Sequence, residues 1–310
     1  MFARIFTVSF NAYREAVRAR VLHGLLGLAL ATTAYSVVLG ALSLNNDMRV
    51  VADIGAASTS LYAILVSVVL GATSLHREVE LKTIFPILTR KLRRHEYVVG
   101  KFFGMVLTLA VFIALDGSAV LGVLAYLAGQ SAALLLGTVA AFAGALAFLL
   151  IRAKYTRTFV LIPWAFALLL AMSVLAAPAA SERRLVLASL ALTVAEVAIV
   201  SAVGLLFSSF SSPFLTATFT LAVFIVGRSA DTLAHLPQRF LSSTIRSTGA
   251  VVAQIVPNLQ LYVPPRPLLL GEIPATPVWL YVARTDALGL FYIVVLIAVS
   301  CFIFRKRDFN

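Results

Sequence analysis

Two acidic residues, Asp116 and Glu196, lie well inside long apolar stretches of the sequence. Placing a charged side chain at the centre of a membrane costs at least about 2.5 to 3.5 kcal/mol, so each carboxylate should face the interior of a helix bundle or a water-filled path. Both residues are therefore candidates for an intramembrane polar site. Ser118 and Thr193 stand close by in sequence and could donate hydrogen bonds to them, and a neutral acid paired with a hydroxyl group is the purely structural alternative.

No enzyme motif is recognisable elsewhere in the chain. The phosphate-binding pattern G-x-x-x-x-G-K-[ST] is absent, because Gly100 and Lys101 are followed by Phe102. The four histidines show no H-x-x-x-H spacing and no carboxylate beside them in a metal-ligand pattern, and Cys301 is the single cysteine. We therefore expect no catalytic residue, metal or cofactor in this chain.

The composition indicates the elements that must position the two carboxylates. Of the 310 residues, 61% are hydrophobic and only 12% are charged, which excludes an ordinary water-soluble protein. The apolar residues come in runs of about twenty, the length that crosses a bilayer as a helix. We predict an all-α, polytopic membrane helix bundle with eight spans, at residues 21–44, 54–75, 102–128, 132–151, 159–177, 185–210, 214–234 and 287–304. The seventh is the weakest, because Arg228 and Asp231 interrupt it, although their spacing would let them pair with each other.

The basic residues predict how these spans are oriented. Seventeen of the 25 Lys and Arg residues fall on one side, with four in 1–20, seven in 76–101, three in 152–157 and three in 305–307. Loops rich in Lys and Arg face the cytoplasm, so both termini are predicted to be cytoplasmic. The formal charge of +12 is then explained by membrane orientation, and we expect no nucleic acid as a partner. A six-span alternative, in which 132–177 dips into the membrane without crossing it, leaves this orientation unchanged.

Three segments outside the spans are distinctive. Residues 1–20 alternate apolar and polar positions at helical spacing, which predicts an amphipathic helix on the cytoplasmic leaflet. The loop 76–101 is basic and contains a short amphipathic helix, a surface that could dock a soluble protein or touch anionic lipid. Residues 235–286 are rich in proline and are predicted to form a cap on the outer face.

The loop also carries a family resemblance. It contains Arg77-Glu78-Val79-Glu80, Thr83-Ile84, Leu88, Arg94, Glu96-Tyr97 and Gly100-Lys101-Phe102, in this order. This series resembles the signature of type-2 ABC transporter permeases, the membrane subunits of many ABC exporters. Segments 12–28, LLFSSFSSP at 205–213 and IVPNL at 255–259 resemble further elements of that family. Two features depart from it: Lys91 stands where a proline is common, and 129–184 looks like an inserted helix pair added to a six-span core.

The resemblance implies a division of labour between subunits. A separate ABC ATPase would bind ATP and Mg, and two permease copies, as a homodimer or heterodimer, would form the path in a prokaryotic plasma (inner) membrane. The domain 21–310 would be the permease, and the cytoplasmic loop would carry the coupling helix that contacts the ATPase. By position, the coupling residues would be Glu78, Glu80, Lys82, Thr83 and Phe85. The path would be lined by the first, second and seventh spans.

Two other functions remain open at this stage. A proton-coupled secondary transporter could use Asp116 and Glu196 and would need no ATPase. A membrane-embedded enzyme acting on lipid is disfavoured, since no cluster of His, Asp or Cys stands at a membrane face. The transported substrate cannot be read from the apolar spans.

Overall fold

The computed structural model describes residues 2–43, 46–74, 93–153, 157–234, 256–263 and 277–306. Within these ranges the chain is helical and contains no strand, which confirms the all-α prediction at this level. The predicted coupling residues lie outside the described residues, as do the rest of the segment 75–92 and most of the predicted outer cap. The helices are α1 (Phe2–Val17), α2 (Arg20–Ala41), α3 (Asp47–Ser74), α6 (Arg94–Leu127), α7 (Ala132–Arg152), α8 (Arg157–Leu175), α9 (Ala180–Ser208), α10 (Pro213–Arg228), α11 (Ala230–Ala234), the 3-10 helix η1 (Leu259–Tyr262) and α14 (Val278–Lys306).

Seven of these helices are long and apolar enough to cross a membrane: α2, α3, α6, α7, α8, α9 and α14. Several long apolar helices in one chain make this a multi-pass membrane protein. The predicted seventh span, 214–234, is divided, because α10 stops at Arg228 after 16 residues and α11 begins at Ala230. The count of eight spans therefore stays a prediction. Both α7 and α8 reach spanning length, with 21 and 19 residues.

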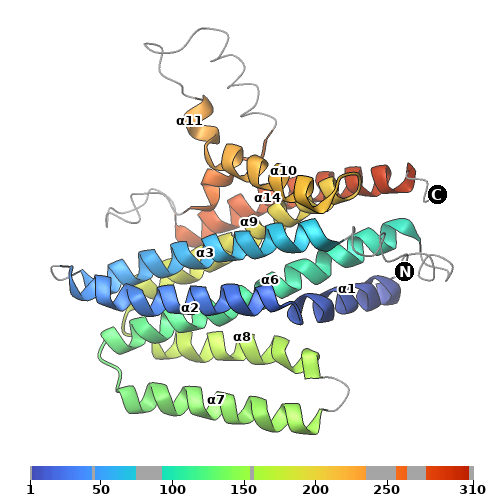
Figure 1. Ribbon diagram of the computed structural model, residues 1–310. Helices are drawn as coiled ribbons and strands as arrows, with labels where there is room; N and C mark the ends of the chain where they lie inside the picture. Colours follow the sequence, from blue (N-terminus) through green and yellow to red (C-terminus); the bar gives the residue numbers. More distant parts are fainter. Residues whose placement is uncertain are drawn as a thin grey trace, which may run out of the picture.

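The core of the bundle lies where α3, α6 and α9 meet (Figure 1). These three helices supply most of the buried side chains, whereas α7 has no buried residue. The α7 and α8 pair lies along one side of the bundle, where α8 packs on α6 and α7 packs on α8. The Trp164 Nε1 of α8 donates a hydrogen bond of 2.8 Å to the Phe142 carbonyl oxygen of α7. Helices α7 and α8 thus lie at the edge of the core, and their origin as an inserted pair stays a prediction.

Small residues bring α3 and α9 into close contact. A Cβ atom added to Gly71 would lie 3.1 Å from the Cα atom of Gly204, so neither position has room for a larger side chain. One turn away, the hydroxyl groups of Ser67 and Ser201 lie 2.9 Å apart in a hydrogen bond. Close backbone approach and interhelical hydroxyl bonds are the means by which membrane helices associate. This contact fixes α3 against α9 and so sets the position of every side chain between them.

The amino-terminal helix α1 packs against the first turns of α6. A Cβ atom on Gly100 would lie 2.6 Å from the Val8 side chain, and one on Gly104 would overlap the Ser9 carbonyl oxygen, so both glycines are needed for this approach. Tyr13 is fully buried there, while Phe2 at the start of α1 is 85% exposed. Helix α1 covers Phe2–Val17 of the segment 1–20, and the amphipathic helix on the cytoplasmic leaflet stays a prediction.

Two ion pairs fasten α1 to α6. Arg4 Nη1 lies 3.7 Å from Glu96 Oε2, and Lys101 Nζ lies 3.3 Å from Glu15 Oε2. Each pair joins an exposed side chain of α1 to a buried one of α6. A buried charge is stable only when it is paired or hydrogen-bonded, so α1 supplies the partners that the start of α6 requires.

Candidate functional site

Both predicted intramembrane carboxylates are fully buried. Asp116, on α6, accepts a hydrogen bond of 2.6 Å from Thr59 Oγ1 of α3 and one of 3.3 Å from Thr33 Oγ1 of α2. The predicted donor, Ser118, was the wrong residue. Its hydroxyl group instead donates to the Leu115 carbonyl oxygen of its own helix at 2.6 Å, which is the usual local bond of a helical serine.

Glu196, on α9, has a different environment. Its Oε2 accepts a hydrogen bond of 3.1 Å from Ser60 Oγ of α3, and its Oε1 lies 3.3 Å from Arg228 Nη2 at the end of α10. Thr193, the predicted donor, was again the wrong residue, because it donates to the Ser189 carbonyl oxygen at 2.8 Å. Glu196 is thus a buried carboxylate held by an ion pair, which offsets part of its desolvation cost.

The pairing expected between Arg228 and Asp231 is also wrong. Arg228 turns toward Glu196, and Asp231 accepts a hydrogen bond of 2.7 Å from Asn258 Nδ2. The helix ends between the two residues, so their spacing in sequence no longer places them on one helix face. The ion pair between Glu196 and Arg228 could have been suggested by the two opposite charges standing in neighbouring apolar spans.

Helix α3 links the two carboxylates. Thr59 contacts Asp116 and the next residue, Ser60, contacts Glu196. Successive helix positions point about 100° apart, so one helix between α6 and α9 can serve both acids at nearly the same height. The structure therefore places Asp116 and Glu196 on different sides of α3, in two separate polar clusters. Asp116 shares its cluster with hydroxyl groups, and Glu196 shares its cluster with a cation.

The guanidinium group of Arg228 is held by several weak contacts. Its Nη1 donates to the Leu259 carbonyl oxygen of η1 at 3.4 Å, and its Nη2 lies 3.4 Å from Ser60 Oγ and 3.5 Å from Glu196 Oε2. The group also lies 5.7 Å from the ring centroid of Phe224. These distances exceed the 2.7 to 2.9 Å that is typical of charge-assisted hydrogen bonds. Arg228 is thus positioned without being fully coordinated.

The η1 turn covers this cluster and is anchored to α14. Tyr262 donates a hydrogen bond of 3.2 Å to the Thr285 carbonyl oxygen, and Tyr281 donates one of 2.6 Å to the Leu261 carbonyl oxygen. Burial, together with the neighbouring carboxylates of Asp286 and Glu196, holds the pKa of Tyr262 above its usual range. Tyr262 is therefore a hydrogen-bond donor at neutral pH.

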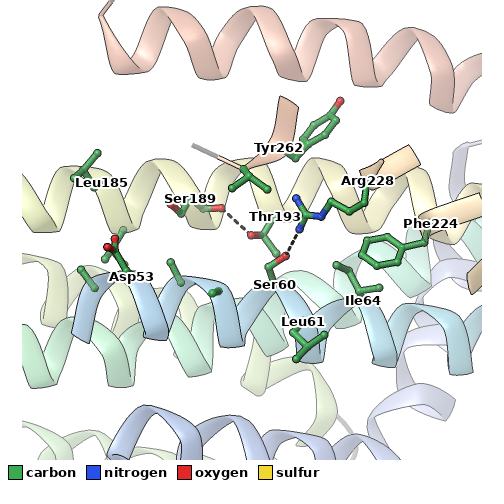
Figure 2. Close-up of a pocket in the computed structure, with 15 residues that line it drawn as sticks. Asp53, Ser60, Leu61, Ile64, Leu185, Ser189, Thr193, Phe224, Arg228 and Tyr262 are labelled. Atoms are coloured by element: carbon green, nitrogen blue, oxygen red, sulfur yellow. Dashed lines mark hydrogen bonds between the residues drawn. The ribbon is translucent and has the colours of Figure 1, made fainter. Parts of the chain in front are cut away.

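A cavity of about 490 Å³ opens beside this cluster. It lies between α3, α9, the end of α10 and η1, and Figure 2 shows Asp53 toward one end and Arg228 toward the other, with Ser60 and Thr193 between them. Its walls are mostly apolar, and the lining residues are Ala52, Asp53, Ala56, Ala57, Ser60, Leu61, Ile64, Leu185, Val186, Ser189, Thr193, Phe224, Arg228, Tyr262 and Val263. Cavities of this size with a few polar groups are typical of small-molecule sites. Asp116 does not line it.

A second set of contacts surrounds the start of α6, next to the segment that carries the signature. Arg94 Nη1 donates a hydrogen bond of 2.8 Å to the Arg305 carbonyl oxygen, and the ring of Tyr97 stacks on that of Phe304 with centroids 6.1 Å apart. Both Arg305 and Phe304 are at the end of α14. Together with the contacts to α1, these bonds make the first turns of α6 a junction of three helices.

Within the ranges that the structure describes, no three His, Cys, Asp or Glu side chains gather closely enough to hold an ion. Neither a protein-family model nor a curated protein matches the chain.

Proposed function

We propose that this chain is the membrane permease subunit of an ABC exporter, and that a separate ABC ATPase drives it through the loop 76–101. The resemblance of that loop and of three further segments to type-2 ABC permeases supports the assignment. The multi-pass bundle fits the same class. The cavity between α3, α9 and α10 supports a role in binding or moving a solute within the membrane.

The observation that carries the proposal is the junction at the start of α6. The chain enters α6 at Arg94, within the signature series, so the last signature residues lie in the first turns of this helix. The first turns of α6 are then fixed to α1 by Gly100, Gly104 and the Lys101–Glu15 pair, and to α14 by the Tyr97–Phe304 stack. Packed helices transmit a displacement as a unit, because close-packed interiors resist deformation. A partner that pushed on the loop would thus move α1, α6 and α14 together.

The proposed partners include a second permease copy. Large apolar side chains of α10 stay exposed in the single chain, among them Phe214, Leu215, Phe219, Leu221 and Ile225. In this proposal a homodimer or heterodimer interface forms next to α2, α3 and α10, in a prokaryotic inner membrane with both termini in the cytoplasm. Lipid covers the remaining apolar surface.

The test is co-purification of this chain with a candidate ABC ATPase from the same organism, followed by assays of ATP hydrolysis in the complex. We expect a stable complex whose ATPase activity falls when Glu78 and Glu80 are both changed to alanine. A matched control is Glu182→Ala, which removes a half-buried carboxylate at the start of α9. An active chain that binds no ATPase would overturn the proposal, and full activity of the double variant would remove the role of the two glutamates.

A proton-coupled secondary transporter is the second candidate, and one observation favours it. Glu196 is fully buried and lies against the Arg228 side chain that lines the cavity. A carboxylate in that position could exchange a proton for its ion pair during transport. This function needs no ATPase, so transport by the purified chain alone in proton-loaded vesicles would support it over the first candidate.

A further inference from the structure

The cavity beside Arg228 carries opposite charges at its two ends. Among the residues that the structure describes, the charged side chains that line the cavity are those of Asp53 and Arg228. Asp53 lies six residues after Asp47, the first residue of α3, and Arg228 contacts Ser60, seven residues further along the same helix. Seven residues of helix rise by about 10 Å, so the two charges are separated along the bundle axis.

A ligand of a single charge does not suit this arrangement. An anion bound to Arg228 would leave the charge of Asp53 uncompensated at the other end of the cavity, and a cation bound to Asp53 would add its charge to a cavity that already holds the guanidinium group of Arg228. Uncompensated charge in a site of low dielectric constant is costly. A ligand with a cationic and an anionic group, each facing its opposite, avoids both costs.

Both Asp53 and Arg228 can bind a further group of opposite charge. Arg228 holds its three protein contacts at 3.3 Å or more, so a closer acceptor could displace them. Asp53 is half-buried, and its carboxylate forms no hydrogen bond or ion pair with the described part of the chain. Arg49, one turn earlier on α3, is a nearby cation but does not line the cavity.

The remainder of the wall fits an acyl chain. Leu61, Ile64 and Phe224 line the cavity near Arg228, on the side away from Asp53 (Figure 2). A single-chain amphiphile could therefore place its ammonium group by Asp53, its phosphate by Arg228 and its first methylene groups against these three side chains. Apolar contacts of this kind contribute about 0.8 kcal/mol for each buried methylene group.

We propose that this cavity is a binding site for a zwitterionic amphiphile with an ammonium and a phosphate group, oriented by Asp53 and Arg228. The site does not depend on the proposed ATPase, because binding requires only the cavity. The proposed binding site can therefore be disproved while the proposed permease function is supported, and the reverse outcome is equally distinguishable.

The test measures binding of lysophosphatidylethanolamine to the purified full chain in a non-ionic detergent by native mass spectrometry. Lysophosphatidylglycerol, which lacks the ammonium group, and a monoacylglycerol, which lacks both charges, are the comparison ligands. We expect the zwitterionic lipid to bind at least about tenfold more tightly than either. Competition by phosphoethanolamine, the soluble head group, separates recognition of the head alone from recognition of the lipid, and we expect little competition because the apolar wall contributes.

Substitutions of Asp53 and Arg228 test which group of the ligand each charge binds. Asp53→Asn should remove the preference over lysophosphatidylglycerol, and Arg228→Gln should weaken binding of both phospholipids by about tenfold, which corresponds to about 1.4 kcal/mol. Ala56→Leu fills the cavity without changing a charge and should abolish binding, whereas Ala34→Leu, on an exposed position of α2, should not. Arg49→Gln controls for loss of a cation outside the cavity and should not weaken binding.

Three results would overturn the proposal: equal binding of all three ligands, an unchanged preference in Asp53→Asn, or full binding in Ala56→Leu. If Arg228→Gln fails to fold, the Asp53 and Ala56 variants still decide the outcome, since neither position contributes to the ion pair with Glu196.

Discussion

The ion pair between Glu196 and Arg228 makes a strong prediction about stability. In Arg228→Gln, the carboxylate of Glu196 loses its cation while it stays fully buried. Removing one partner of a buried pair leaves an uncompensated charge and typically costs about 3 to 5 kcal/mol. Ser60 still donates one hydrogen bond to the carboxylate, so we expect a loss near the lower end of this range.

The reverse change should cost less. In Glu196→Gln the amide can still accept the hydrogen bond from Ser60, and the side chain of Arg228 is 23% exposed, so its charge stays in contact with a more polar environment. The double variant, Glu196→Gln with Arg228→Gln, removes both charges. It should be more stable than Arg228→Gln alone, because no unpaired carboxylate remains.

The assay is thermal unfolding of the three variants and the original chain in one detergent. At about 2 °C per kcal/mol for a chain of this size, Arg228→Gln should lower the midpoint by about 6 °C or more. The double variant should recover a large part of that loss. If Arg228→Gln unfolds at the original temperature, or if the second substitution lowers the midpoint further, the two side chains are not coupled as the structure indicates.

Three further predictions concern other contacts. Gly104→Leu should displace α1 from α6, because a side chain there would overlap the Ser9 carbonyl oxygen, and faster proteolysis of α1 would report it; unchanged protection would contradict the packing. Thr59→Val should lower the unfolding free energy by about 1 to 3 kcal/mol, since Asp116 loses its shorter hydrogen bond, whereas Asp116→Asn with Thr59 intact should cost less. Burial raises the pKa of Tyr13 to about 12. The stability that the neutral phenol contributes is therefore complete below pH 10 and is lost as the pH rises toward 12. In a pH series of thermal midpoints, Tyr13→Phe should abolish that decrease.

The sequence was sufficient to predict the helical bundle and the burial of the two carboxylates. Hydropathy predicts spans well because a membrane admits only helices or closed barrels, so long apolar runs have few alternatives. Charge inside such a run is costly, which is why Asp116 and Glu196 could be selected without a structure. The helix ends were less predictable: α14 begins at Val278, nine residues before the predicted span, because amphipathic turns continue a helix beyond its apolar part.

The hydrogen-bond partners could not be predicted in the same way. Local spacing suggested Ser118 and Thr193, yet both hydroxyl groups bond to carbonyl oxygens of their own helices. The actual donors, Thr59 and Ser60, come from a helix far away in sequence. Which helices are neighbours is decided by packing, here by the contact between Gly71 and Gly204, and a single sequence does not report that contact.

Site-directed cross-linking can show whether the loop 76–101 contacts the ATPase subunit. Cys301 is the single cysteine in the chain, so Cys301→Ser gives a cysteine-free background into which Thr83→Cys can be introduced. A matched position is Thr232→Cys in α11, which follows the end of α10 that lies farther from the termini (Figure 1). With the co-purified ATPase, we predict that position 83 forms a cross-link to the ATPase whose yield changes with bound nucleotide, and that position 232 forms none. No cross-link from position 83, or equal yields from both positions, would contradict it.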